Sequence, residues 1–156
     1  MIRQKLHKCL HNKCLLIGVG NLLRGDDAFG PLAIQRLKGK TSVKILDAGV
    51  APENLMGPVQ RFQPSNIIFL DAVALDDPPG SLHWIDPRDL DQISVSTHAS
   101  SLDLLFSYLK NNNPEVKMYI VGVVPTRIGL GDKISEPVNR ALKEIVTLIT
   151  ELAPPT

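Results

Sequence analysis

Residues 14–38 have the sequence CLLIGVGNLLRGDDAFGPLAIQRLK, in which an apolar run, a glycine-rich turn and an amphipathic stretch follow one another. The apolar run, 14–20, predicts a strand. From Asp27 to Lys38 the apolar residues recur at roughly helical spacing, which predicts a helix, and Pro31 suits its first turn. A strand followed by a helix in this way is typical of α/β proteins.

The same alternation continues to the end of the chain. Strands are predicted at 43–46, 67–70, 81–85 and 117–124, and helices at 52–62, 100–109 and 136–152. The wholly apolar run 67–70 belongs in the middle of the sheet, because such runs are covered on both faces, and 117–124 closes the sheet. The repeated alternation predicts a three-layer α/β/α sandwich with a twisted, mostly parallel five-stranded sheet.

Length and charge narrow the classes of function. A chain of 156 residues has the size of one compact domain, so we expect residues 1–156 to share a single core. The formal net charge of +1, with both signs interspersed, disfavours nucleic acid and anionic membranes as partners. We find no apolar run near the roughly 20 residues of a membrane span and no signal-peptide core. We therefore expect a cytoplasmic protein without membrane insertion.

Residues 1–12 are expected to form an N-terminal helical extension, although a second interpretation exists. Four candidate zinc ligands gather here, at a spacing that matches no familiar finger, ribbon or knuckle: His7, Cys9, His11 and Cys14. The alternative is a short amphipathic helix with apolar positions at helical spacing: Ile2, Leu6, Cys9 and Leu10. Two cysteines are too few for a disulfide framework, so we expect free thiols.

Acidic residues stand where three of the predicted strands end. Asp27 follows the first strand, Asp47 ends the second and Asp71 ends the third, while His98 opens the helix after the fourth. Residues at the carboxyl ends of parallel strands line the ligand crevice of such a sheet. We therefore expect these side chains to converge on one edge, with Asp27, Asp71 and His98 exposed in a crevice. Each residue alone is commonly a helix cap, a turn residue or a structural histidine, so only their joint placement favours a site.

The glycines beside the first strand also invite a nucleotide-binding interpretation. Asp26 and Asp27 stand at the helix start, however, where two carboxylates would cap the N–H donors and repel a phosphate but could bind a cation. Two carboxylates and an imidazole form a borderline-hard donor set that suits nickel, zinc or manganese. Three protein ligands leave coordination positions for water or a substrate group. These residues leave open whether the metal belongs to this protein or arrives with a partner.

The opening motif GVGNLLRGDDAFG, residues 18–30, resembles the signature of the hydrogenase maturation endopeptidases. Further matches follow in order and extend the resemblance from about residue 14 to about residue 150: DAGVAPEN at 47–54, in the form seen in the formate-hydrogenlyase branch, IFLDA at 68–72, STH at 96–98, VGVVP at 121–125 and IGL at 128–130. Ala48 departs from the family pattern, which has a glycine there, and residues 1–12 lie outside the match.

The resemblance implies an endopeptidase that trims the C-terminal extension of a nickel-iron hydrogenase large-subunit precursor after nickel insertion, cutting behind a basic residue. By position, Asp27, Asp71 and His98 match the family's three metal ligands, and Asp47 matches a further functional acid. The nickel would come with the substrate, although other divalent metals could occupy the site. The family is grouped with aspartic peptidases, and either a metal-bound or a carboxylate-activated water is consistent with these residues.

A rival from another class uses the same three ligands. A non-catalytic nickel-binding chaperone would hold the metal tightly by itself and hand it to a hydrogenase without cutting anything. The endopeptidase, by contrast, is expected to bind nickel weakly when alone, because its three ligands are completed only by the substrate. We expect the free protein to be a monomer.

Overall fold

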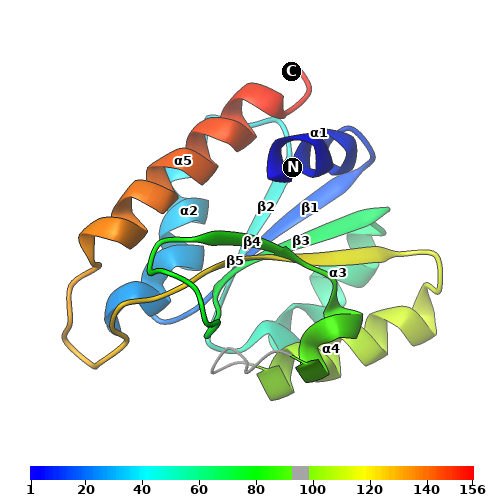
Figure 1. Cartoon of the computed structure of the whole chain (residues 1–156). Helices are drawn as coiled ribbons and strands as arrows, with labels where there is room; N and C mark the ends of the chain where they lie inside the picture. The colour runs from blue at the N-terminus through cyan, green and yellow to red at the C-terminus, as the bar shows by residue number, and fades with distance from the viewer. Residues whose placement is uncertain (93–98) are drawn as a thin grey trace.

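In residues 1–92 and 99–156, which the computed structural model describes except for the side chains of 90–92 and 99–101, five strands form one sheet in the order β2-β1-β3-β5-β4 (Figure 1). The strands are β1 (Cys14–Val19), β2 (Lys44–Gly49), β3 (Asn66–Ala72), β4 (Leu82–Ile85) and β5 (Lys117–Val123). All the neighbours in this order pair in parallel except β4, which is antiparallel to β5. The predicted mostly parallel sheet is confirmed, with β3 in its middle. The strand at 117–124 does not close the sheet, because β4 pairs outside it.

Helices connect these strands at the predicted places. They are α1 (Ile2–Leu10), α2 (Phe29–Leu37), α3 (Met56–Phe62), α4 (Ala99–Asn112) and α5 (Glu136–Leu152), with 3-10 turns η1 (Gly25–Ala28), η2 (Pro52–Leu55) and η3 (Pro87–Gln92). The helix predicted from Asp27 therefore begins as a 3-10 turn and becomes α-helical only at Phe29. In the described part of the chain, no helix has the length and apolar character needed to cross a bilayer.

The helices cover both faces of the sheet (Figure 1). α1, α2 and α5 pack on one face, and α3 and α4 pack on the other. Side chains alternate along β1, so Leu16 packs in the core beneath α1, α2 and α5, while Leu15 and Ile17 pack in the core beneath α3 and α4. Burial on both faces explains why β1 and β3 are almost continuously apolar. The predicted three-layer α/β/α sandwich is therefore confirmed.

Glycines let α2 approach the sheet closely. A Cβ on Gly30 would lie 2.2 Å from the carbonyl oxygen of Leu70 and 2.5 Å from that of Val19. A Cβ on Gly18 would lie 2.5 Å from the carbonyl oxygen of Gly30. Any side chain at these positions would push the helix away from the strands. The two glycines thus set the first turn of α2 against the carboxyl ends of β1 and β3.

The N-terminal segment forms the amphipathic helix α1 and not a zinc site. Leu6, Cys9 and Leu10 are buried, and α1 packs against α5. Burial raises the pKa of both thiols, that of Cys14 to about 12, which disfavours the thiolate form that zinc requires. In residues 1–89, where every side chain is described, no three potential ligands gather to hold a metal ion. The zinc interpretation is therefore not supported.

Candidate functional site

The sheet order reverses at β1, because the chain goes from β1 outward to β2 and then across β1 to β3. At such a point the connections leave neighbouring strands in opposite directions and open a ligand crevice at the carboxyl ends. Asp27 lies in the connection after β1, and Asp71 is the penultimate residue of β3. The topology thus brings the two predicted acids to the carboxyl ends of β1 and β3, next to the point of reversal.

Asp71 is a strand residue, whereas the sequence placed it at the end of a strand. β3 continues through Ala72, and Asp71 pairs in register with Gly122 of β5. The side chain of Asp71 is 0% exposed, and its Oδ1 accepts a hydrogen bond of 2.8 Å from the N–H of Ala72. The prediction of an exposed carboxylate was wrong, because β3 is flanked by β1 and β5 and covered by helices on both faces.

Asp27 lies in η1, the turn that precedes α2, and is 4% exposed. The backbone N–H of Asn21 donates to its Oδ2 at 2.9 Å. Gly20, with a φ of +147°, folds the chain tightly here, since a Cβ on it would lie 1.9 Å from the carbonyl oxygen of Asp27. The prediction of exposure was wrong for Asp27 too, because the backbone that leaves β1 folds over it.

Asp26 binds a distant loop instead of capping α2. Its carboxylate is 0% exposed and accepts four hydrogen bonds, from Ser135 N (2.7 Å), Ser135 Oγ (2.7 Å), Thr126 N (2.8 Å) and Arg127 N (3.2 Å). The N-cap residue of α2 is Ala28, with no side-chain hydrogen bond. The predicted capping by two carboxylates was therefore wrong. Asp26 anchors the loop after β5 to η1, and so fixes the position of Asp27.

Asp47 is exposed at the carboxyl edge of the parallel strands, where Asp27 and Asp71 also lie. It lies within β2, pairs in register with Gly18 beside a bulge, and accepts a 2.9 Å hydrogen bond from the N–H of Gly49. Asp47 and Asn21 both line an open hollow of about 320 Å³. Because Asn21 also donates to Asp27, the hollow lies directly beside the buried acid.

His98, the third predicted ligand, lies outside the described residues, as does the rest of segment 93–98. Among the residues that the structure does describe, no group of three or more His, Cys, Asp or Glu side chains could hold a metal ion. Of the three predicted metal ligands, Asp27 and Asp71 are among the described residues. Those two are carboxylates, whose oxygens suit a divalent cation.

Glu53, a residue that the sequence analysis did not single out, shows an unusual environment. It lies in η2, which contacts β2 and α4. Its Oε2 is buried and accepts no hydrogen bond from the residues that the structure describes. A buried acceptor without a partner costs free energy. In the sequence, the signal that could have pointed to Glu53 is its position in the segment APEN, residues 51–54, of the family motif.

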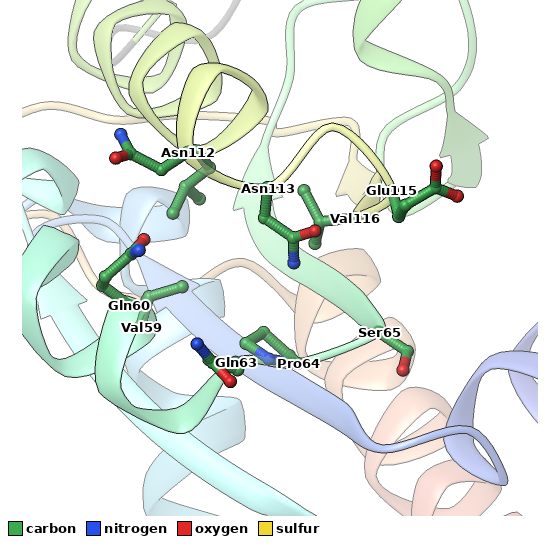
Figure 2. Close-up of a pocket in the computed structure, with 10 residues that line it drawn as sticks. Val59, Gln60, Gln63, Pro64, Ser65, Asn112, Asn113, Glu115 and Val116 are labelled. Carbon is green, nitrogen blue, oxygen red and sulfur yellow. The ribbon is translucent and has the colours of Figure 1, made fainter.

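Two larger hollows lie at the opposite edge of the sheet. Figure 2 shows one of about 370 Å³, lined by four side-chain amides among other residues: Gln60, Gln63, Asn112 and Asn113. The other, of about 650 Å³, is bordered by Trp84 and Tyr119. Both are also lined by Ser65, which directly precedes β3. They therefore open at the amino ends of the parallel strands, away from the acids.

Known proteins are similar to this chain in sequence and fold. A family model described as hydrogenase maturation protease matches residues 32–152. The chain is 29% identical to the hydrogenase 3 maturation protease of Escherichia coli K12 over 134 residues, covering 84% of this chain and 85% of the relative. A crystal structure of the NiFe hydrogenase maturation protease HycI from Thermococcus kodakarensis KOD1 has a TM-score of 0.85 and 31% identity, covering 95% of this chain and 97% of that one. A crystal structure of a hydrogenase 3 maturation protease has a TM-score of 0.75 and 26% identity, covering 88% and 89%.

Proposed function

This chain belongs to the hydrogenase maturation protease family, and from that premise we propose that it is an endopeptidase that removes the C-terminal extension of a nickel-iron hydrogenase large-subunit precursor after nickel insertion. The observation that carries this proposal is the placement of Asp27 and Asp71 on either side of the point where the strand order reverses. A parallel sheet binds its ligand at that point. The relatives named above are proteases, which favours a peptide as the reacting ligand.

Nickel enters this proposal as part of the substrate. Asp27, Asp71 and His98 would supply two carboxylate oxygens and one imidazole nitrogen, a donor set that nickel accepts. A precursor with nickel in place would gain binding free energy from these ligands, and an empty precursor would not. The metal thereby becomes a checkpoint that precedes cleavage.

The fixed orientation of the two acids supports this assignment. Moving a carboxylate out of water is costly unless hydrogen bonds or a cation compensate its charge. Asp27 and Asp71 are both nearly inaccessible, and backbone N–H groups donate hydrogen bonds to both carboxylates. Their orientation is therefore set before a substrate arrives, which reduces the entropy lost on binding.

Asp47 is the acid that we assign to the hydrolytic water. It is exposed, it lines the hollow next to Asp27, and the N–H of Gly49 orients its carboxylate. A carboxylate within hydrogen-bond reach of a water can accept its proton as the water attacks a peptide carbonyl.

The decisive experiment mixes the purified protein with nickel-loaded and with nickel-free large-subunit precursor and determines the intact mass of each product. We expect only the nickel-loaded precursor to become shorter. Cleavage of both forms would contradict the checkpoint, and cleavage of neither would contradict the protease. A protein that transferred nickel without shortening the precursor would instead be a chaperone.

A further inference from the structure

Large apolar side chains are exposed on loops at the carboxyl edge of the sheet. Leu22 (47% exposed) and Leu23 (67%) follow β1, Val50 (54%) follows β2 and Leu130 (72%) lies in the loop after β5. We call these four residues the apolar rim. Among the described residues, the other large hydrophobic side chains with comparable exposure are Met1, at the N-terminus, and Leu104, on α4.

The members of the apolar rim are neighbours in space. Leu22 and Val50 line the same hollow, which Asp47 also lines. The N–H of Gly131 donates to the carbonyl oxygen of Leu23 at 2.8 Å, so Leu130 lies beside Leu23. The rim therefore extends from the loop after β2, past the loop after β1, to the loop after β5.

Hydrogen bonds hold the rim in place. The side-chain oxygen of Asn21 accepts a bond of 2.9 Å from the N–H of Leu23, and the backbone carbonyl oxygen of Asn21 accepts one of 3.1 Å from the N–H of Arg24. Gly, Pro, Asn, Asp and Ser are the residues that dominate turns. In this turn, by contrast, the side chains of Leu22 and Leu23 are exposed to water. Exposed apolar surface of this kind marks an interaction site, because burying it against a partner is favourable.

Every part of the rim belongs to a loop that carries or fixes an acid of the site. Leu22 and Leu23 lie between Asn21 and Asp27, and Val50 lies three residues after Asp47. Leu130 belongs to the loop that the carboxylate of Asp26 anchors through Thr126 and Arg127. A chain that reached these acids at this edge would therefore meet the rim.

Charged side chains border the rim. Four of them are exposed on the loops after β1 and β5: Arg24, Arg127, Asp132 and Lys133. An apolar centre with a charged border is the composition of surfaces that bind proteins. A small ligand would need an enclosed pocket instead, and the hollow beside Leu22 is open.

We propose that the apolar rim is the docking surface for apolar side chains of the large-subunit precursor beside its cleaved bond. The proposal rests on the proposed function and adds the surface by which this chain holds its protein substrate. Docking of this kind binds the substrate before and during cleavage equally, so it determines KM and leaves kcat unchanged.

The test compares the double variant Leu23→Ser/Leu130→Ser with the wild type in cleavage of nickel-loaded precursor. We expect KM to rise about tenfold or more, while kcat stays within about twofold. The double variant Leu23→Met/Leu130→Met should keep the wild-type KM, because methionine preserves apolar area. Leu104→Ser, which removes an exposed leucine from α4, should also behave as the wild type. If the first variant does not fold, Leu130→Ser alone replaces it.

Failure of the docking proposal and failure of the proposed function give different results. If the wild type cuts the precursor and the serine variant keeps the wild-type KM, the docking proposal is wrong and the protease stands. If the wild type does not cut, the protease is wrong, and the dissociation constant for the same precursor then tests docking alone. An unchanged dissociation constant in the serine variant would overturn it. So would sedimentation that showed a wild-type dimer lost in the serine variant without a change in precursor binding.

Discussion

Asp26 and Ser135, 109 positions apart in the sequence, are joined by two hydrogen bonds of 2.7 Å, one from the backbone N–H of Ser135 and one from its hydroxyl. Their contact holds the loop after β5 against η1 and leaves the next residue, Asp27, beneath the backbone N–H of Asn21. Two consecutive acids of one motif therefore have separate roles. Asp26 stabilises the edge of the sheet, and Asp27 is the acid to which we assign a role in the chemistry there.

Replacement of Asp26 should affect stability. Asp26→Ala removes the acceptor of four hydrogen bonds and leaves the two buried donors of Ser135 without this partner, so we expect the free energy of unfolding to fall by about 2–5 kcal/mol. Urea unfolding would measure this change. In Asp47→Ala, which alters an exposed carboxylate with one local hydrogen bond, the loss should stay below about 1 kcal/mol. Equal stability of the two variants would contradict the anchoring role.

Replacement of the proposed nickel ligands should instead affect cleavage. Because Asp27 and Asp71 are buried, asparagine is the appropriate substitute: it keeps the shape and an acceptor oxygen but removes the charge. We expect Asp27→Asn, Asp71→Asn and His98→Ala each to lower cleavage of nickel-loaded precursor by about a hundredfold or more. Glu144→Gln, on the exposed face of α5, should cleave at the wild-type rate. Full activity in two of the three site variants would refute the assignment.

The close contact of α2 with the sheet should tolerate no methyl group. Gly30→Ala would place its Cβ against the carbonyl oxygen of Leu70, and we expect a loss of about 3 kcal/mol or more in the free energy of unfolding. In Gly57→Ala, the new Cβ in α3 meets only the flexible guanidinium of Arg61 at 3.2 Å. Helix propensity should then raise stability by about 0.5–1 kcal/mol. Denaturant unfolding of both variants would show whether their effects differ in sign.

The buried thiol of Cys14 predicts a loss of stability in alkali. Burial raises its pKa from 9.0 to about 12, so the folded state keeps the neutral thiol over a range in which the unfolded chain ionises. The stabilisation is complete below about pH 9 and is lost as the pH rises toward about 12. We expect the free energy of unfolding to fall across this range, and to fall less in Cys14→Val. An identical pH dependence in both proteins would contradict this explanation.

Nickel binding by the isolated protein separates the protease from a chaperone. With two carboxylates and one imidazole, the site lacks the ligands that the precursor would supply, so calorimetry should detect only weak binding of nickel. Addition of nickel-loaded precursor should give much tighter association. Tight binding of nickel by the protein alone would favour the chaperone.

The order of elements could be predicted from the sequence because the direction of a side chain is a local property. Periods of about two and 3.6 residues mark the faces of strands and helices without any knowledge of their neighbours. The continuous apolar run in β3 therefore indicated a strand covered on both faces. In the same way, Asp27, Asp47 and Asp71 could be assigned to strands whose carboxyl ends share one edge.

Only the tertiary structure decided what surrounds each acid. Asp71 is buried because β1 and β5, distant in sequence, flank β3, and Asp26 is held by Thr126, Arg127 and Ser135. Burial and hydrogen bonding depend on segments that the topology brings together, so no local pattern could tell an exposed carboxylate from a buried one. The apolar rim has the same origin, because Leu22 and Leu23 resemble core residues in the sequence and are placed in water by the packing of three separate loops.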